Sequence, residues 1–424
     1  MMMGFALRML GSVAYSMVVQ YYYGFGDSFT FYSGGNFFRD QIKNDLGSIN
    51  YLFAPFDEMK DWFTAYTTNP AFTGYFSAPA SNMVMRISAI FSYLSFNAFL
   101  IISLFFSFFS FMGQWKLFKV FNGINNYRYS KLLAFAILYT PSIWFWGSGI
   151  LKDSICLGSV GFIIHILYKF FVRKKFSFLN LFFLCFLIFI VNTIKSYIIT
   201  IITMGIIIMF FSVFIKSFKN RLIRLTLIFF AIITSALLFY VSNFTNEINE
   251  LAEESIAQIE DFQKNYQTSS ESDETSKAGF GLGELDPTPT SLILKSPVVI
   301  FTCLFRPFIW ESRKVFILFT SFETMLVFLS TMYLMFRIGI IRFFTSIFKT
   351  PYLLFCFVIS MLFALIIGFT TFNFGTMIRY KIIFLPFYYF LLVNLYINYV
   401  AGRKKIIVSV ANKPAAEKNI EHGA

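Results

Sequence analysis

Apolar residues fall into runs of about twenty along most of the 424-residue chain, separated by short polar connectors. A run of this length forms a helix that crosses a ~30 Å hydrocarbon layer. The pattern therefore predicts an all-α, polytopic integral membrane bundle of about ten transmembrane helices. The predicted spans are residues 5–23, 96–115, 131–148, 151–171, 176–194, 197–216, 222–243, 315–336, 351–371 and 380–400.

Two long polar segments interrupt these runs. Segment 24–85 contains short amphipathic pieces such as Phe56 to Tyr66, and we expect it along the membrane surface. The insert Asn246 to Thr290 carries 11 of the 22 acidic residues. Its first part has the apolar spacing of an amphipathic helix, and its Ser-, Glu-, Gly- and Pro-rich second part is typical of a disordered or lid-like segment. The apolar run 291–305 is too short to cross comfortably, so we expect it to be re-entrant or to lie on the outer face.

These boundaries divide the chain into four parts. A seven-span module with its external loop comes first, followed by an external loop with the re-entrant segment. A three-span module and a basic cytoplasmic tail complete the chain. The four parts are residues 1–243, 244–314, 315–400 and 401–424.

The charge pattern predicts the orientation. The formal net charge is +13. With the N-terminus inside, five inner segments hold 20 basic and only two acidic residues, namely 114–131, 169–175, 216–224, 337–349 and the tail from 401. Positive connectors remain on the cytoplasmic side, so we predict a multi-pass membrane protein with both termini cytoplasmic. The same explanation of the charge argues against a nucleic-acid partner.

This topology places unusual charged residues together at the outer ends of the spans. Charges near an apolar bundle are costly unless they face water, a partner or a substrate. One external polar cavity is the economical explanation for Asp27, Lys152, Asp153, Lys195, Arg306, Glu311, Arg379 and Lys381.

Several of these residues have two interpretations. Asp27 follows two glycines and is either an ordinary loop acid or a general base or metal ligand. Lys152 and Asp153 either form a mutual ion pair or divide the work, with the lysine binding a phosphate and the aspartate orienting it. Lys195 either extends to the membrane interface or joins the site. Glu323, inside an apolar run, is expected to pair with one of the cations.

Two further stretches suit a phosphate-bearing ligand. Arg306 presents a planar fork, and Trp310 could stack on a sugar ring or anchor at the interface. The stretch from Thr371 to Lys381 adds the amide of Asn373 and two cations, Arg379 and Lys381. The four cysteines have neither metal-ligand spacing nor a disulfide pattern, and we interpret them as small core residues.

The motifs Gly-Asp-Ser, Pro-Ser...Phe-Trp-Gly-Ser-Gly-Ile-Leu-Lys-Asp-Ser, Arg-Pro-Phe-Ile-Trp-Glu and Asn-Phe-Gly-Thr...Arg-Tyr-Lys resemble those of bacterial polytopic proteins of cell-surface polysaccharide synthesis. More broadly, the chain is similar to the GT-C membrane glycosyltransferases and the polysaccharide polymerases. The resemblance assigns the catalytic base or metal ligand to Asp27. Because Ser28 follows it, no Asp-X-Asp or Asp-Glu pair is present, which leaves dependence on Mg²⁺ or Mn²⁺ open. Asp153 and Glu311 are the other candidate catalytic carboxylates. By the resemblance, the family's lipid-phosphate site corresponds to Lys152, Arg306, Arg379 and Lys381.

Two function classes follow. The first is an inverting glycosyltransferase or polymerase that moves a sugar or glycan from a polyprenyl-phosphate or polyprenyl-diphosphate carrier to a glycan or lipid acceptor outside the membrane. The second is a transporter or flippase of a lipid-linked anionic glycan. Transporters tend to contain internal repeats and paired broken helices, and the sequence shows neither, so we favour the enzyme.

Overall fold

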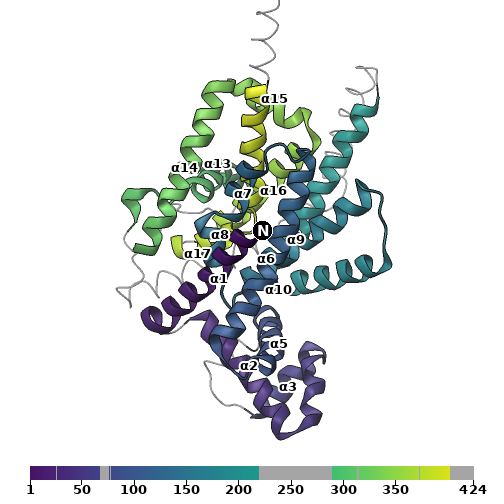
Figure 1. Cartoon of the computed structure of the whole chain (residues 1–424), viewed down its shortest axis with the longest axis vertical. Coiled ribbons are helices and arrows are strands. Elements are labelled where there is room, and N and C mark those ends of the chain that lie inside the picture. The colour runs from purple at the N-terminus through teal and green to yellow at the C-terminus, as the bar shows by residue number, and fades with distance from the viewer. Residues whose placement is uncertain are drawn as a thin grey trace, which may run out of the picture.

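The architecture comes from a computed structural model that describes residues 1–24, 26–66, 76, 78–218, 289–312, 315–371 and 373–401. The described part is helical throughout and contains no β-strand (Figure 1). This confirms the all-α class.

Six helices in the described residues are long and apolar enough to cross a membrane. A seventh span is possible where a short helix meets the helix Leu385–Ala401 at a bend of 65°. The segments are α1 (Met2–Met17) with its π-helical continuation η1 (Val18–Tyr23), α6 (Phe99–Ile124), α9 (Lys152–Phe171), α10 (Phe178–Ser217), α14 (Val315–Ile338), α16 (Pro351–Thr370) and the bent helix α17 (Phe374–Lys381). The multi-pass character is supported, and the count of ten spans stays a prediction.

The predicted span 131–148 is not one helix. It consists of α7 (Ser130–Leu138) and α8 (Pro141–Trp146), and neither is long enough to cross alone. Pro141 has no amide hydrogen to continue α7, and it forces Thr140 into an extended conformation (φ −63°, ψ 121°). Pro141 is therefore the first residue of a new helix, α8.

The predicted spans 176–194 and 197–216 form one segment, α10, which contains a break. Lys195 has the non-helical angles φ −151° and ψ 85°. The break lies in the gap predicted between the two spans. The predicted span 222–243 lies outside the described residues.

The described residues between 27 and 94 form a helical lobe below the bundle in Figure 1, and the expected position of this segment along the membrane surface stays a prediction. The predicted amphipathic piece is confirmed as α3 (Phe56–Tyr66). The lobe also has an aromatic stack, in which the Trp62 ring lies 5.6 Å from Phe38 and 4.7 Å from Tyr51. These rings bury one another, and Phe38 and Trp62 belong to the same hydrophobic core cluster as the bundle. Its other elements are α2 (Asp27–Asn44), the 3₁₀-helix η2 (Leu46–Leu52) and α5 (Pro79–Leu94).

The remaining helices are α13 (Pro289–Phe305), the 3₁₀-turn η4 (Ile309–Glu311) and α15 (Ile340–Lys349). The run expected to be re-entrant forms α13, which packs against α16 and α14. Its path relative to the membrane stays a prediction. The insert as far as residue 288 and the tail from 402 lie outside the described residues.

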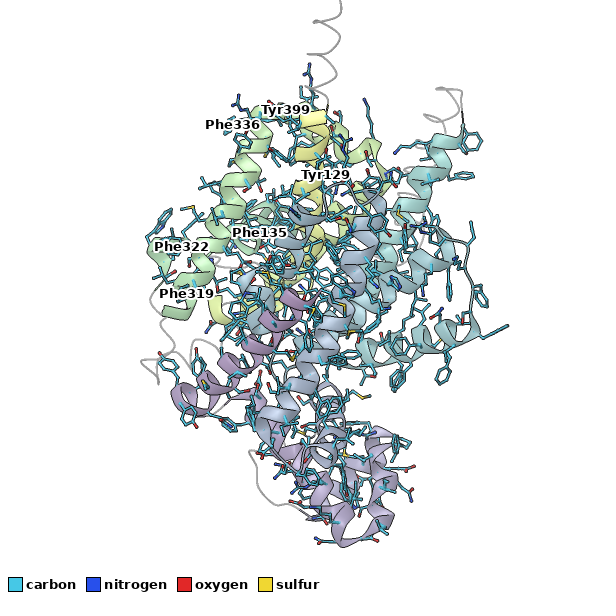
Figure 2. All side chains as sticks on the ribbon, viewed as in Figure 1. Tyr129, Phe135, Phe319, Phe322, Phe336 and Tyr399 are labelled. Atoms are coloured by element: carbon cyan, nitrogen blue, oxygen red, sulfur yellow. The ribbon has the colours of Figure 1, made fainter. Side chains whose placement is uncertain are left out.

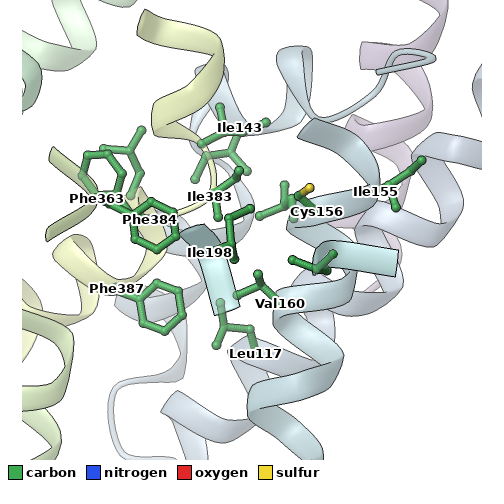
Figure 3. Close-up of a cluster of buried hydrophobic side chains, with 14 of the residues drawn as sticks. Leu117, Ile143, Ile155, Cys156, Val160, Ile198, Phe363, Ile383, Phe384 and Phe387 are labelled. Atoms are coloured by element: carbon green, nitrogen blue, oxygen red, sulfur yellow. The ribbon is translucent and has the colours of Figure 1, made fainter. Parts of the chain in front are cut away.

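The core lies where α6, α9, α10, α16 and the segment after α17 meet. Figure 3 shows the side chains of Leu117, Val160, Ile198 and Phe384 converging there. Cys156 belongs to this cluster, and Cys303 and Cys356 are also buried, whereas Cys185 is exposed. The interpretation of the cysteines as core residues is therefore confirmed for three of them and wrong for Cys185.

A buried arginine ties the first helix to the bundle. Arg8 is 1% exposed and donates to the Ile143 carbonyl at 2.9 Å, to the Ser110 hydroxyl at 3.4 Å and to the Gln114 side chain. A buried guanidinium needs such acceptors to offset its lost hydration. These bonds hold α8 against α1 and α6.

Basic connectors predicted to share one side do gather at one end. Three of these connectors are bordered by Tyr129, Phe336 and Tyr399. These residues lie toward the upper end of Figure 2, while the lobe lies at the lower end. Lys216, in a fourth connector, donates to the carbonyls of Phe348 and Lys349 at 3.0 Å each. The bundle thus has a basic end and a lobe end.

Candidate functional site

A cavity of about 390 Å³ lies between α1 with η1, the start of α2, α8, α14 and α17. Its polar lining includes Asp27, Ser28, Asn373, Thr376 and Arg379. Its apolar lining is formed by Tyr15, Val18, Val19, Tyr23, Phe145, Trp146, Ile317 and Ile378. The exposed Gly26 also lines it, so the cavity reaches the protein surface. The lining suits a molecule with one polar and one apolar part.

The cavity lies at the span ends opposite the basic connectors. Tyr15 is near the last residue of α1, and Ile317 is near the first residue of α14. Arg379 precedes the helix Leu385–Ala401, whose far end borders the basic tail. That helix rises about 25 Å, at 1.5 Å per residue. The cavity is therefore about one hydrocarbon thickness away from the basic end.

An ion-pair cluster stands at the polar wall. Arg379 places Nη1 at 2.8 Å from Oδ2 of Asp27 and Nε at 3.0 Å from Oδ2 of Asp153. Lys195 donates from Nζ to Oδ1 of Asp153 at 2.6 Å. Residues from α2, α9, α10 and α17 thus meet although they are distant in sequence. The prediction that Asp27, Asp153, Lys195 and Arg379 come together is confirmed.

Lys152 does not pair with the adjacent Asp153, so the predicted mutual ion pair is wrong. Adjacent residues on a helix do not face each other. The Lys152 ammonium instead lies 5.7 Å from the centre of the Phe31 ring. It still interacts electrostatically with Asp27, Asp153, Lys195 and Arg379. Three cations and two carboxylates make the cluster positive by one charge.

Lys195 does not extend to an interface. Its side chain is 9% exposed, and its ammonium lies 3.5 Å from the centre of the Tyr380 ring as well as against Asp153. The broken backbone of α10 at this residue carries the ammonium toward α9 and α17. Of its two predicted interpretations, the structure supports membership of the site.

A second group lies outside the cavity lining. Arg306 pairs with Glu311, and Oε2 of Glu311 also accepts from the Phe308 amide at 2.8 Å. Burial alone raises the pKa of Glu311, but the hydrogen bond from Arg306, the bond from the Phe308 amide and the Arg306 charge together hold that pKa below its ordinary value. Trp310 is 73% exposed and stacks on Phe308. The turn is thus a compact, internally paired unit.

Lys381 connects the two groups through α17. Its ammonium donates to the Arg306 carbonyl at 2.5 Å, and the residue is 1% exposed. The prediction that one cavity is lined by all these residues is therefore wrong. Of the predicted site residues, only Asp27, Asn373 and Arg379 line it, and those outside the lining are Lys152, Asp153, Lys195, Arg306, Trp310, Glu311 and Lys381. The side chain of Asn373 lines the cavity and accepts from the Gly375 amide at 2.7 Å, which caps α17.

Glu323 also differs from its prediction. Its carboxylate accepts from the Ser142 amide at 2.9 Å, the Ser142 hydroxyl at 2.7 Å and the Tyr389 hydroxyl at 2.7 Å. Neutral donors therefore satisfy it in place of an ion pair with a cation. It joins α14 to the start of α8, whose far end carries Phe145 and Trp146 into the cavity wall.

Sequence reasoning missed two groups of the cavity. The Tyr15 hydroxyl and the Ser28 hydroxyl share a hydrogen bond of 2.9 Å, and the latter also donates to the Ile150 carbonyl at 3.1 Å. Tyr15 sits in an apolar run where an aromatic residue gives no signal of its role. In the sequence, Ser28 belongs to the Gly-Asp-Ser motif and stands where a paired-acid motif would have its second acid, but neither feature indicates its hydrogen bonds.

A metal does not fit the carboxylates of this site. Among the described residues, no three or more His, Cys, Asp or Glu side chains come together as ligands. Asp27 and Asp153 both face the Arg379 guanidinium, whose charge opposes a nearby divalent cation. No step below is assigned to Mg²⁺ or Mn²⁺.

Comparisons with family models, with curated proteins and with solved structures found no match to this chain.

Proposed function

We propose that the protein is a membrane glycosyltransferase. It would transfer a sugar or glycan repeat unit from a polyprenyl-phosphate or polyprenyl-diphosphate carrier to a glycan or lipid acceptor. The reaction would take place at the external face of the bacterial inner membrane, with both termini cytoplasmic. One observation carries the proposal: a surface-reaching cavity with both apolar and polar lining residues sets a carboxylate and a guanidinium 2.8 Å apart at the span ends opposite the basic connectors.

In this mechanism Asp27 is the general base. Its side chain is 30% exposed and lines the cavity, so an acceptor hydroxyl can reach it. The acceptor oxygen attacks the anomeric carbon and its proton passes to Asp27. The bond from that carbon to the carrier phosphate breaks, and the electron pair leaves with the phosphate. Attack opposite the leaving group inverts the configuration.

Arg379 stabilises the charge that develops on the departing phosphate. Asp153 is 1% exposed and does not line the cavity, so it acts as a positioning residue for Arg379 rather than as a catalytic acid. Lys152 and Lys195 add positive charge behind Arg379. Lys381, through the Arg306 carbonyl, holds the end of α17 in place.

The apolar wall supports a lipid-linked donor over a free nucleotide sugar. Val18, Val19, Ile317 and Ile378 offer an aliphatic surface, and Phe145 and Trp146 add aromatic faces from α8. An isoprenoid chain buries apolar area against such a wall, with its phosphate at the polar side. A nucleobase would stack on the aromatic faces, but it would leave the aliphatic residues without an apolar partner.

A second candidate, a transporter or flippase of a lipid-linked anionic glycan, is favoured by a different observation. α10 breaks at Lys195, and α17 meets the next helix at 65°. Both broken segments carry cations that pair with Asp153. Transporters often build their substrate sites from discontinuous helices.

The test uses purified protein in lipid nanodiscs with a polyprenyl-diphosphate-linked glycan, and measures new glycosidic bonds. Asp27→Asn keeps the size and removes the base, so transfer is expected to stop. Arg379→Ala is expected to lower kcat about 100-fold or more. Asp40→Asn is the matched control, because Asp40 forms a surface pair with Arg39 and is 55% exposed.

Full transfer by Asp27→Asn would remove the general-base assignment. A companion assay in proteoliposomes measures movement of the same carrier between leaflets. Movement of the carrier between leaflets without any new glycosidic bond would refute the glycosyltransferase proposal and support the transporter.

A further inference from the structure

Asp27 occupies the position on Arg379 that an anionic ligand needs. Two nitrogens of the guanidinium face carboxylates, Nη1 facing Asp27 at 2.8 Å and Nε facing Asp153 at 3.0 Å, and the contact at Nε lacks hydrogen-bond geometry. A phosphate binds best to the same planar N–H fork. Of the two carboxylates, only Asp27 lines the cavity, so a ligand entering there meets this ion pair.

The two carboxylates are held very differently. Asp153 is 1% exposed, lies in the first turn of the 20-residue helix α9 and has Lys195 as its second cation. Moving it would leave buried charges unpaired, which is strongly unfavourable. Asp27 is 30% exposed and is the first residue of α2.

The backbone before Asp27 gives it freedom to move. Gly24 and Gly26 have φ angles of 67° and 121°, and among the described residues no atom outside the adjoining chain lies within 4 Å of where a Cβ would be on either. Glycine adopts these angles readily, and the open surroundings impose no steric barrier. A shift of the first turn of α2 has to break the hydrogen bonds of the Ser28 hydroxyl to Tyr15 and to the Ile150 carbonyl, whereas α9 is held by the buried ion pairs of Asp153.

The charge balance favours an exchange of anions. With Lys152 the cluster is positive by one, and departure of Asp27 raises this excess by one more unit. A phosphate at Arg379 restores the balance. Once away from the guanidinium, the Asp27 carboxylate is also a stronger base, because a neighbouring cation stabilises the ionised form.

We propose that Asp27 is a displaceable plug: the carrier phosphate takes its place on Arg379 and thereby releases Asp27 as the base. This rests on the proposed function, since it names how the donor and the base share one site. It makes binding ordered, with the lipid phosphate first and the acceptor hydroxyl second. An empty site keeps its base paired and inactive toward stray hydroxyl groups.

The first test measures binding of decaprenyl monophosphate to the protein in nanodiscs, without any turnover. Asp27→Asn is expected to bind the probe about tenfold more tightly, which corresponds to an open fraction of about one tenth in the unaltered protein. Asp40→Asn is expected to leave the affinity unchanged. Equal or weaker binding by Asp27→Asn overturns the plug, because Asp27 would then hold Arg379 ready for the phosphate.

A second measurement separates displacement from a simple change of charge. Hydrogen exchange of the first-turn amides of α2, residues 27–30, is expected to accelerate when saturating decaprenyl monophosphate binds the unaltered protein. Tighter binding by Asp27→Asn without any change in this exchange would mean a distant charge effect and would overturn the plug.

The outcomes also separate this inference from the proposed function. Faster exchange and tighter binding with no glycosidic bond formed support the plug and refute the transferase. Failure of decaprenyl monophosphate to bind both the unaltered protein and Asp27→Asn refutes the plug and the assignment of Arg379 to the carrier phosphate.

Discussion

Asp153 holds the site together, and its replacement by asparagine should be strongly destabilising. The substitution keeps the size and removes one charge from a residue that is 1% exposed. Its oxygens lie 2.6 Å from Nζ of Lys195 and 3.0 Å from Nε of Arg379. Without the carboxylate, a buried ammonium and a largely enclosed guanidinium face each other across a neutral amide.

The magnitude follows from this burial. Removing one partner of a buried ion pair typically costs about 3–5 kcal/mol, because the other charge is left uncompensated. Arg379 retains Asp27 at 2.8 Å, whereas Lys195 loses its ion-pair partner. We therefore expect a loss of about 3–5 kcal/mol in the free energy of unfolding for Asp153→Asn.

The assay is reversible unfolding in mixed micelles with increasing denaturing detergent, followed by tryptophan fluorescence. Asp40→Asn is the matched control, since its pair with Arg39 has a similar distance of 2.7 Å but the Asp40 side chain is 55% exposed. Exposed pairs contribute about 0–1 kcal/mol, so the control should change little. Adding Lys195→Met to Asp153→Asn should recover part of the loss, with a coupling of about 0.5–3 kcal/mol.

Equal stability losses for Asp153→Asn and Asp40→Asn would refute the reasoning. So would a double variant that is less stable than the sum of its two single variants predicts. Either result would mean that burial does not control the energetics of this cluster.

Two further predictions concern other parts of the chain. Gly113→Ala should lower the free energy of unfolding by about 1–3 kcal/mol, because a Cβ there overlaps the Gly158 backbone where α6 crosses α9. Gly123→Ala on the same helix is the control, because its Cβ meets only a 3.4 Å contact. Equal losses for the two variants in the same unfolding assay would contradict this prediction. The depressed pKa of Glu311 contributes stability to its turn above about pH 4.3, and this stability is lost as the pH falls through the folded-state pKa. The fluorescence of Trp310 should therefore change only in acid, and Glu311→Gln should abolish that change.

Helical segments followed from local chemistry. An apolar run of twenty residues must bury its backbone polar groups within one helix, whatever surrounds it. This reasoning identified the helices from Phe99 and from Pro351, and helical periodicity identified the amphipathic helix Phe56–Tyr66. The polar residues around Lys195 also marked where α10 breaks. Pro141 was visible too, but its effect on the span 131–148 was missed.

Only the tertiary structure decided which side chains the charged residues pair with. Burial of the charges of Asp27, Asp153 and Arg379 in an apolar chain is unfavourable for each residue by itself, so the sequence suffices to predict that they gather. It does not show that Asp153 turns away from Lys152, or that Glu323 is satisfied by neutral donors. Those choices depend on which helix faces pack together, and packing brings residues from α2, α9, α10 and α17 within 3 Å of one another. An ion pair forms only across such distances, so the site exists in the folded bundle and not in any one segment.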